Sequence, residues 1–334
     1  MCIRDRYGQY TIYFTAPIAK EEYKTHLSIA PEVVSEGWYL SSDNNWLNVN
    51  GYFKPDTEYT VTIDGSLEDE WGGRLGQTLT YTFITPSAEP SLSVLTGYTS
   101  YNLMFVPEED SEILLQATNI NTVTFEIAPI SFEDLLTLVH PDNYEYREIF
   151  LPANLEVITH NLQLTRNVNQ GVTLPLTYQG EPLQSGIYFL GVTSSDLFDN
   201  NQQAYQKYYL IVSDNHVVMK ISPEQTFLWA TQMADYSPLA NTPVSIYNAE
   251  GDLVTSGETD PDGFFINEIS RFDSPYTSFL TVLGEPGQDD FGFSISTWDQ
   301  GYALYEMGIR QNTLPPETQA YLYTDRPIYR PGDT

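Results

Sequence analysis

Two aspartates in the last third of the chain have the spacing of metal ligands. Asp260 and Asp262 stand in the sequence TDPDG, and D-x-D-G begins the calcium loop of an EF-hand, where carboxylate oxygens surround a hard cation. The rest of that loop is missing, because no bidentate Glu follows at the needed position and the neighbouring residues have a strand pattern. We therefore predict a hairpin turn stabilised by Asp side chains and Gly263, and we interpret Asp69–Glu70 and Asp289–Asp290 in the same way.

The four histidines and the one cysteine form no recognisable motif. His26, His140, His160 and His216 have no i, i+4 partner and no H-E-x-x-H pattern. Cys2 is the only cysteine, which excludes an intrachain disulfide and a Cys-based zinc site. G-x-S-x-G, Walker and dinucleotide motifs are absent, although a Ser-His-Asp triad stays open because its members need not be adjacent. We predict no catalytic, cofactor-binding or metal-binding residue, and a protein that is not an enzyme.

The five tryptophans are candidates for aromatic platforms that bind sugar rings. In β-sandwich domains, however, an isolated Trp more often packs in the core or at its edge. We expect that structural role for Trp38, Trp46, Trp71, Trp229 and Trp298.

The net charge restricts the classes of partner. The chain has 334 residues, with 14 Lys and Arg against 45 Asp and Glu, so its net charge is −31. Nucleic acids and anionic membrane surfaces would be repelled, because proteins recognise both through Lys and Arg. The content of 41% hydrophobic and 14% aromatic residues indicates a folded chain. The sequence has no long apolar run and no signal-peptide pattern at its start, so we expect no direct membrane insertion by this segment.

Short alternating segments predict an all-β fold. Three segments are rich in β-branched and aromatic residues, and their apolar residues alternate with a period of two. They are Tyr10–Thr15 (YTIYFT), Tyr59–Ile63 (YTVTI) and Leu79–Phe83 (LTYTF). Clusters of Gly, Pro, Asn and Asp separate such segments at intervals of roughly 8 to 12 residues, as in antiparallel sandwiches. We predict tandem antiparallel β-sandwich domains over 1–88, 89–214 and 215–317, with the start of a further, truncated domain at 318–334.

One segment, Ser131–Val139 (SFEDLLTLV), has the pattern of a short helix. Ser131 can cap it, and Asp134 stands at the capping-box position. Its apolar residues share one face: Phe132, Leu135, Leu136 and Val139. We predict that this helix crosses the inside of a sandwich domain, with a partner-binding helix as the alternative.

The first predicted domain contains the signals of an Ig-like sandwich. Pro55 and Asp56 set a turn, and Tyr59 begins a strand as in a tyrosine corner, where the hydroxyl can bond backbone upstream. With Phe14–Ile18 (FTAPI) and Thr82–Thr85 (TFIT), this part resembles bacterial Ig-like domains. Those domains have a further strand before the FxxPI segment, so we expect the N-terminal strand to be incomplete and a sheet edge to be exposed.

The most specific pattern lies at the end of the chain. Residues 321–334 read YLYTDRPIYRPGDT, and they follow a PLANTPV turn, an IYNAEG hairpin and the TDPDG run. These stretches resemble the bacterial alpha-2-macroglobulin family, in which the terminal motif opens the next macroglobulin domain. The resemblance covers about 89–334 well and 7–88 more loosely.

This resemblance implies the non-catalytic N-terminal portion of an endopeptidase inhibitor that traps proteases. It also implies a location outside the cytoplasm, and it places the target endopeptidases on regions beyond this chain. The family's reactive centre is a thioester between Cys and Gln in C-x-E-Q. Ser222–Gln225 (SPEQ) matches that motif only in part, because serine has no thiol, and we interpret it as the entrance to a strand.

Two alternative hypotheses of function are consistent with the sequence. A structural or adhesive cell-surface array would use the same sandwiches as rigid spacers, and an accessory region of a secreted glycosidase would bind glycans. More macroglobulin domains beyond Thr334 would favour the inhibitor, whereas repeated Ig-like units and an anchor would favour the array.

Overall fold

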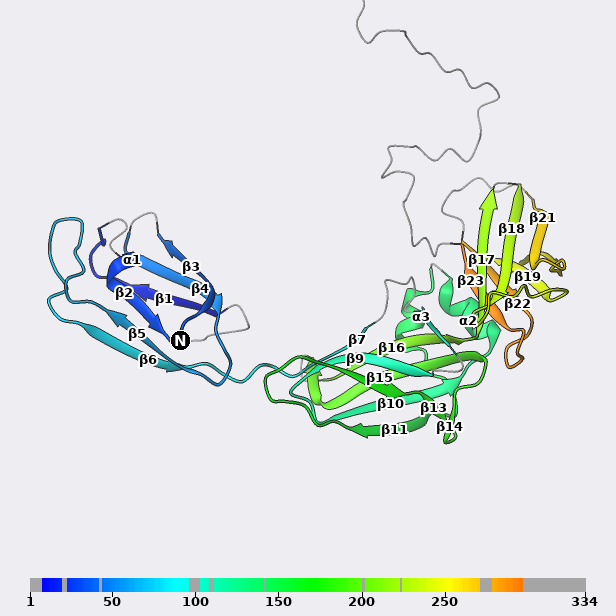
Figure 1. Ribbon diagram of the computed structural model, residues 1–334, viewed down its shortest axis with the longest axis horizontal. Coiled ribbons are helices and arrows are strands. Elements are labelled where there is room, and N and C mark those ends of the chain that lie inside the picture. Colours follow the sequence, from blue (N-terminus) through cyan, green and yellow to red (C-terminus); the bar gives the residue numbers. More distant parts are fainter. Residues whose placement is uncertain are drawn as a thin grey trace, which may run out of the picture.

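The protein is organised as three groups of paired β-sheets that follow one another along the chain (Figure 1). The computed structural model describes residues 8–19, 23–41, 44–95, 103–107, 111–140, 142–199, 202–222, 224–270 and 278–296. We call the groups the N-terminal unit (8–85), the central unit (91–212) and the C-terminal unit (215–296). The predicted all-β fold of tandem sandwiches is confirmed. Strand pairing in the described residues is antiparallel except between β16 (Gln202–Val212) and β8 (Leu103–Val106), which run parallel.

The N-terminal unit packs the sheet β1-β4-β3 against the sheet β2-β5-β6. Its elements are β1 (Gly8–Tyr13), α1 (Tyr23–His26), β2 (Leu27–Ala30), β3 (Val34–Leu40), β4 (Trp46–Tyr52), β5 (Glu58–Ile63) and β6 (Leu79–Ile84). Along β5, buried residues alternate with partly exposed ones, as the sequence pattern predicts. The hydroxyl of Tyr59 accepts a 2.8 Å hydrogen bond from the backbone N–H of Lys54, so the predicted tyrosine corner is confirmed.

The central unit pairs a five-stranded sheet, β11-β10-β15-β16-β8, with a three-stranded sheet, β12-β9-β7. Its remaining elements are β7 (Ser91–Val94), β9 (Glu112–Thr118), β10 (Thr122–Pro129), α2 (Phe132–Val139), α3 (Tyr144–Ile149), β11 (Glu156–Asn161), β12 (Gln170–Pro175), β13 (Thr177–Tyr178), β14 (Glu181–Pro182) and β15 (Gly186–Asp199). Strand β15 is buried on both faces over residues 186–194. Leu190 on one face lies in the core between the two sheets, and Phe189 on the other face packs with α2.

The C-terminal unit pairs the sheet β17-β18-β21 with the sheet β20-β19-β22-β23. Its strands are β17 (Asn215–Ser222), β18 (Gln225–Gln232), β19 (Pro243–Asn248), β20 (Leu253–Glu258), β21 (Phe264–Glu268), β22 (Phe279–Leu283) and β23 (Gly292–Ile295). Strand β22 is also buried on both faces. Phe279 and Leu283 belong to the core of this unit, whereas Leu280 and Val282 face the central unit.

The predicted helix forms, but its expected place inside one sandwich is wrong. The capping box between Ser131 and Asp134 is present as predicted. Helix α2 lies outside the two sheets of the central unit, where Leu135 and Leu138 share one buried cluster with Phe293 of β23. The helix therefore fills the space between two units. The described residues also contain two short helices, α1 and α3, where the sequence pattern indicates only α2.

Candidate functional site

The carboxylates with metal-like spacing stabilise turns. Asp260 Oδ1 accepts hydrogen bonds from the backbone N–H groups of Asp262, at 2.9 Å, and Phe264, at 2.8 Å. Gly263 has a φ of +79°, a left-handed conformation that glycine adopts without strain. The predicted hairpin turn is confirmed. Asp69 Oδ1 likewise accepts hydrogen bonds from the backbone N–H groups of Trp71 and Gly73.

The histidines are widely separated. His160 packs edge-on against Phe125, with ring centroids 5.1 Å apart, and its burial lowers the pKa of its imidazole. His140 Nδ1 accepts the N–H of Asp142, and His216 is exposed. No cluster of three or more His, Cys, Asp or Glu side chains in the described part of the chain could hold a metal ion. Cys2 lies outside the described residues.

The SPEQ segment joins two strands. Ser222 ends β17 and Gln225 begins β18, and the Ser222 hydroxyl accepts the N–H of Gln225 at 3.1 Å. The predicted entrance to a strand is confirmed, because the segment leads from the end of β17 into β18. A hydroxyl in an exposed hairpin has no thioester chemistry.

The tryptophans differ in exposure. Trp46 packs against Tyr39, with ring centroids 5.7 Å apart, as expected for a structural residue. Trp71 is 75% exposed, which contradicts its expected packing role. Trp229 is 40% exposed and stacks on Phe264, with centroids 6.1 Å apart. Trp298 and the side chain of Trp38 lie outside the described residues.

One cluster of perturbed titratable groups lies on the five-stranded sheet beside α3. The Tyr205 hydroxyl donates a 2.7 Å hydrogen bond to Glu126 Oε2, and burial followed by this bond raises the pKa of the tyrosine. Burial lowers the pKa of Lys207. The Lys207 ammonium donates to the carbonyl oxygens of Glu148 and Phe150, and those carbonyls end α3. These bonds cap a helix, so the cluster stabilises the fold.

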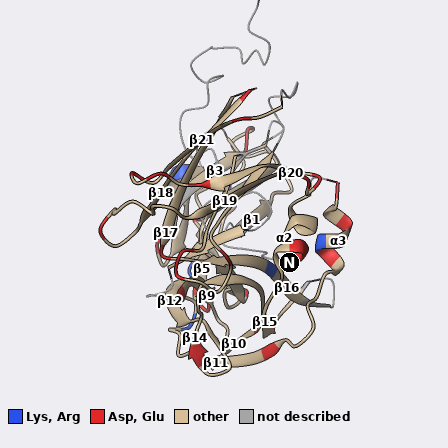
Figure 2. Ribbon diagram, turned by 90° about the vertical axis from the view of Figure 1, so that its right-hand side faces the viewer, with Lys and Arg blue, Asp and Glu red and all other residues tan. Residues whose placement is uncertain are grey.

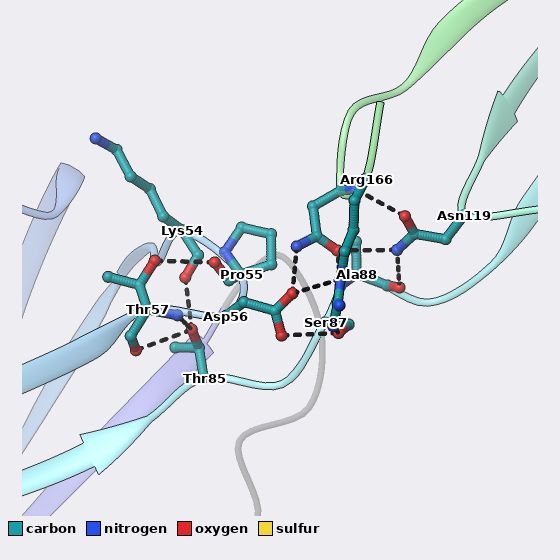
Figure 3. A network of polar contacts seen from close by, with 10 residues as sticks. Lys54, Pro55, Asp56, Thr57, Thr85, Ser87, Ala88, Asn119 and Arg166 are labelled. Atoms are coloured by element: carbon teal, nitrogen blue, oxygen red, sulfur yellow. Dashed lines mark hydrogen bonds and ion pairs between the residues drawn. The ribbon is translucent and has the colours of Figure 1, made fainter. Parts of the chain in front are cut away.

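The features with a mechanical consequence are the two junctions between units. At the first junction, between the N-terminal and central units, the Asp56 carboxylate contacts the connecting segment (residues 86–90) and the central unit (Figure 3). It accepts hydrogen bonds from Ser87 Oγ and Asn167 Nδ2, each at 2.7 Å, and lies 2.9 Å from Arg166 Nε. The bonds from Asn167 and Ser87, and then the charge of Arg166, hold the pKa of Asp56 below its usual value.

Two asparagines of the central unit hold the connecting segment. The N–H of Ala88 donates to Asn167 Oδ1 at 2.9 Å, and the carbonyl of Ala88 accepts from Asn119 Nδ2 at 2.6 Å. The two asparagines also bond to each other, through Asn119 Nδ2 to Asn167 Oδ1 and Asn167 N–H to Asn119 Oδ1. Beside them is an open cleft of about 470 Å³ lined by Ser87, Ala88, Pro90, Asn119, Ile120, Asn121, Leu162, Gln163, Leu164 and Arg166.

The second junction, between the central and C-terminal units, is apolar. Helix α2 and the outer face of the five-stranded sheet meet strands β22 and β23 in a single buried cluster. Phe132 of α2 packs against Tyr247 of β19, with ring centroids 5.1 Å apart. Fourteen buried residues form the cluster: Leu103, Leu135, Leu138, Val139, Phe150, Ile187, Phe189, Tyr209, Ile211, Leu280, Val282, Phe291, Phe293 and Ile295. The central and C-terminal units therefore share a core.

The two junctions differ in the free energy that their contacts contribute. Each buried Leu, Ile or Phe contributes about 1.5 to 3 kcal/mol on burial, so the apolar junction holds two units firmly. At the polar junction, the ion pair between Asp56 and Arg166 is exposed, with 38% and 72% of the two side chains accessible. Such a pair contributes about 0 to 1 kcal/mol. This ion pair therefore contributes less than the burial of one apolar side chain at the second junction.

Charge does not mark either junction as a binding surface for anions. Figure 2 shows Asp and Glu spread over loops and strands, with few Lys and Arg between them. None of the helices in the described part of the chain is long and apolar enough to cross a bilayer, and the longest has eight residues.

The geometry defines a tandem array of β-sandwich units with one polar and one apolar junction. No protein-family profile matches the chain. It is 20% identical to an alpha-2-macroglobulin homolog of Nostoc sp. over 98% of this chain and 18% of that protein. It is also 20% identical to an alpha-2-macroglobulin homolog of Yersinia pestis over 94% of this chain and 16% of that protein. The chain thus spans less than one fifth of the length of these relatives.

Solved structures have the same fold. Native Escherichia coli alpha-2-macroglobulin spanning domains MG0, NIE and MG1 is 17% identical, with a TM-score of 0.52, over 88% of this chain and 93% of that chain. Salmonella alpha-2-macroglobulin reacted with methylamine is 16% identical, with a TM-score of 0.64, over 88% of this chain and 17% of that chain. The chain is related to the bacterial alpha-2-macroglobulins.

Sequence reasoning missed the residues that form the junctions. Asp56 is expected only as a turn residue, and no local pattern marks Asn119, Arg166 or Asn167. The one signal in the sequence is the pair of asparagines themselves, since Asn tolerates the left-handed conformation that both adopt. Their joint hold on Ala88 depends on the fold, because Asn119 and Asn167 are far apart in sequence.

Proposed function

We propose that this chain is the non-catalytic N-terminal portion of an alpha-2-macroglobulin-like endopeptidase inhibitor that traps proteases. Its role is mechanical: the sandwich units form an arm that helps to surround a protease, and target endopeptidases contact regions beyond the chain. The observation that carries the proposal is the shared fold over nearly the full length of a solved segment of alpha-2-macroglobulin. The protein would act outside the cytoplasm, in the periplasm, at the cell surface or after secretion.

The roles of the charged side chains support a non-enzymatic role. The carboxylates Asp69 and Asp260 are used in turns, and Lys207 caps a helix. The polar contacts of Asp56 and the apolar cluster around α2 join neighbouring units, and neither arrangement is one that chemistry requires. An arm of this kind needs units of fixed shape and a defined angle between them.

We also propose the domain limits. Buried cores lie within 10–83, 92–212 and 217–283, which supports domains at 1–88, 89–214 and 215–317. Residues 318–334, the proposed start of a further domain, lie outside the described residues.

The full-length protein should cage proteases without blocking their active sites. The experiment incubates it with an endopeptidase and then measures cleavage of a small chromogenic peptide and of a large protein substrate. We expect peptide cleavage to persist while cleavage of the large substrate is lost. Unchanged cleavage of both substrates would contradict the proposal, and equal loss of both would indicate blockade of the active site instead.

A further inference from the structure

The connection between the N-terminal and central units is held at both ends. On the N-terminal side, Thr85 is buried, and its hydroxyl donates to the carbonyl of Lys54 at 2.6 Å and accepts the N–H of Thr57 at 2.9 Å. On the central side, the N–H and carbonyl of Ala88 are both bonded to asparagine side chains. Only residues 86 and 87 lie between these two attachment points.

The two residues between the attachment points have different freedoms. Proline has a φ near −65° that its ring fixes, so Pro86 contributes little rotation about φ. Ser87 is held only through its side chain, which donates to Asp56 Oδ1 at 2.7 Å and accepts from Arg166 at 2.7 Å. The carbonyl of Pro86 accepts the N–H of Asp56 at 3.2 Å. Asp56 therefore contacts each residue of the connection and also reaches the central unit.

We infer that residues 86–87 are a pivot and that the Asp56 carboxylate is a latch that holds the N-terminal unit at one angle to the central unit. With the latch closed, one carboxylate binds Ser87, Arg166 and Asn167 together (Figure 3). With it open, the attachments at Thr85 and Ala88 persist, and the N-terminal unit rotates about the two residues between them. Because the contacts are polar and partly exposed, a partner that binds either state can shift the angle at small cost.

The matched variants follow from the backbone. Asp56 has a φ of +48°, and Asn tolerates this left-handed conformation as Asp does, so Asp56→Asn removes the charge without strain. Arg166→Gln removes the partner from the central side. Asp64→Asn is the control, because the Asp64 carboxylate likewise accepts a hydrogen bond from a serine hydroxyl, that of Ser66, but takes no part in the junction.

The experiment measures the distance distribution between spin labels on the two units by double electron–electron resonance. Labels are attached at the exposed positions Gln77→Cys and Glu181→Cys of the complete chain, in a Cys2→Ser background. We expect one narrow distribution, and at least a twofold broadening in Asp56→Asn and Arg166→Gln but not in Asp64→Asn. Salt at 1 M should broaden the parent distribution in the same direction.

Two results would overturn the latch. An unchanged distribution in both Asp56→Asn and Arg166→Gln would show that these contacts do not set the angle, and equal broadening in Asp64→Asn would show a general loss of structure. Unchanged thermal unfolding of each variant keeps the comparison valid. The measurement needs no protease, so the latch and the proposed trapping function stand or fail separately.

Discussion

The hydroxyl of Ser213 donates a 2.6 Å hydrogen bond to the backbone carbonyl of Phe291. Both residues are fully buried. Ser213 lies in the two-residue connection between β16 and β17, and Phe291 immediately precedes β23. This bond fastens the connection between the central and C-terminal units to the body of the C-terminal unit. It is the opposite of the pivot at 86–87, which is fastened mainly by one exposed carboxylate.

Removing the side chain of Asn215 should destabilise the junction between the central and C-terminal units. Asn215 Nδ2 donates to the carbonyls of Asp289, at 2.7 Å, and Phe291, at 2.9 Å. Asn215→Ala leaves these carbonyls without that donor, at a cost of about 1 to 3 kcal/mol. Ser213→Ala should cost about 1 kcal/mol. Urea unfolding gives both values, and Ser222→Ala, in an exposed hairpin, is the control that should change stability by less than about 0.5 kcal/mol.

Helix α2 should contribute to stability as a core element. Leu135 is fully buried in the shared cluster, so Leu135→Ala removes buried methyl groups and leaves a cavity. We expect a loss of about 2 to 5 kcal/mol in the free energy of unfolding. Leu253→Ala, at a position that is 55% exposed, should change it by less than about 0.5 kcal/mol. Equal effects of the two substitutions in chemical denaturation would refute the placement of α2.

Loss of the hydroxyl should lower the free energy of unfolding at one buried tyrosine, Tyr59, but not at another, Tyr209. The Tyr59 hydroxyl accepts the N–H of Lys54, so Tyr59→Phe should cost about 1 to 3 kcal/mol because that donor loses its partner. Among the described residues, the buried Tyr209 hydroxyl has no hydrogen-bond partner. Tyr209→Phe should therefore be neutral or stabilising. Thermal unfolding of the two variants checks this, and a larger loss in Tyr209→Phe would contradict the geometry.

The same tyrosine predicts a loss of stability at alkaline pH. Burial raises the pKa of Tyr209 from 10.0 to about 12. The folded-state pKa lies above the unfolded one, so ionisation of Tyr209 favours the unfolded state. The free energy of unfolding is therefore unaffected below pH 10.0 and falls as the pH rises to about 12. The shift corresponds to about 3 kcal/mol. Urea unfolding across this pH range should show a steeper loss in the parent chain than in Tyr209→Phe, and identical slopes would exclude the effect.

Local chemistry is the part of this protein that the sequence predicts well. The alternation along β5, the Ser131 capping box and the Asp260 turn each depend on residues within a few positions of one another. The capping box and the turn satisfy backbone N–H groups nearby, and the alternation follows from the period of a strand, so the pattern and the structure agree. The terminal motif at 321–334 adds the family resemblance, which no single domain pattern provides.

Placement of elements across long distances is the part that the sequence does not predict. The amphipathic pattern of α2 indicates a buried face, but not that Leu138 packs against strands more than 130 residues later. Helix α3 has six residues and no buried side chain. It is held by Lys207 at its end and by Arg147, whose guanidinium donates to the carbonyls of Leu138 and His140.

The central and C-terminal units share one core. A reporter in one unit combined with a substitution in the other tests this claim most directly. Trp229 lies in the C-terminal unit. It becomes the single fluorescent reporter when Phe replaces Trp38, Trp46, Trp71 and Trp298. Leu138→Ala in the central unit should lower the free energy of unfolding by about 2 to 5 kcal/mol. The midpoint of the Trp229 fluorescence transition should fall together with that of the circular-dichroism transition. An unchanged Trp229 transition beside a lowered circular-dichroism transition would contradict the shared core.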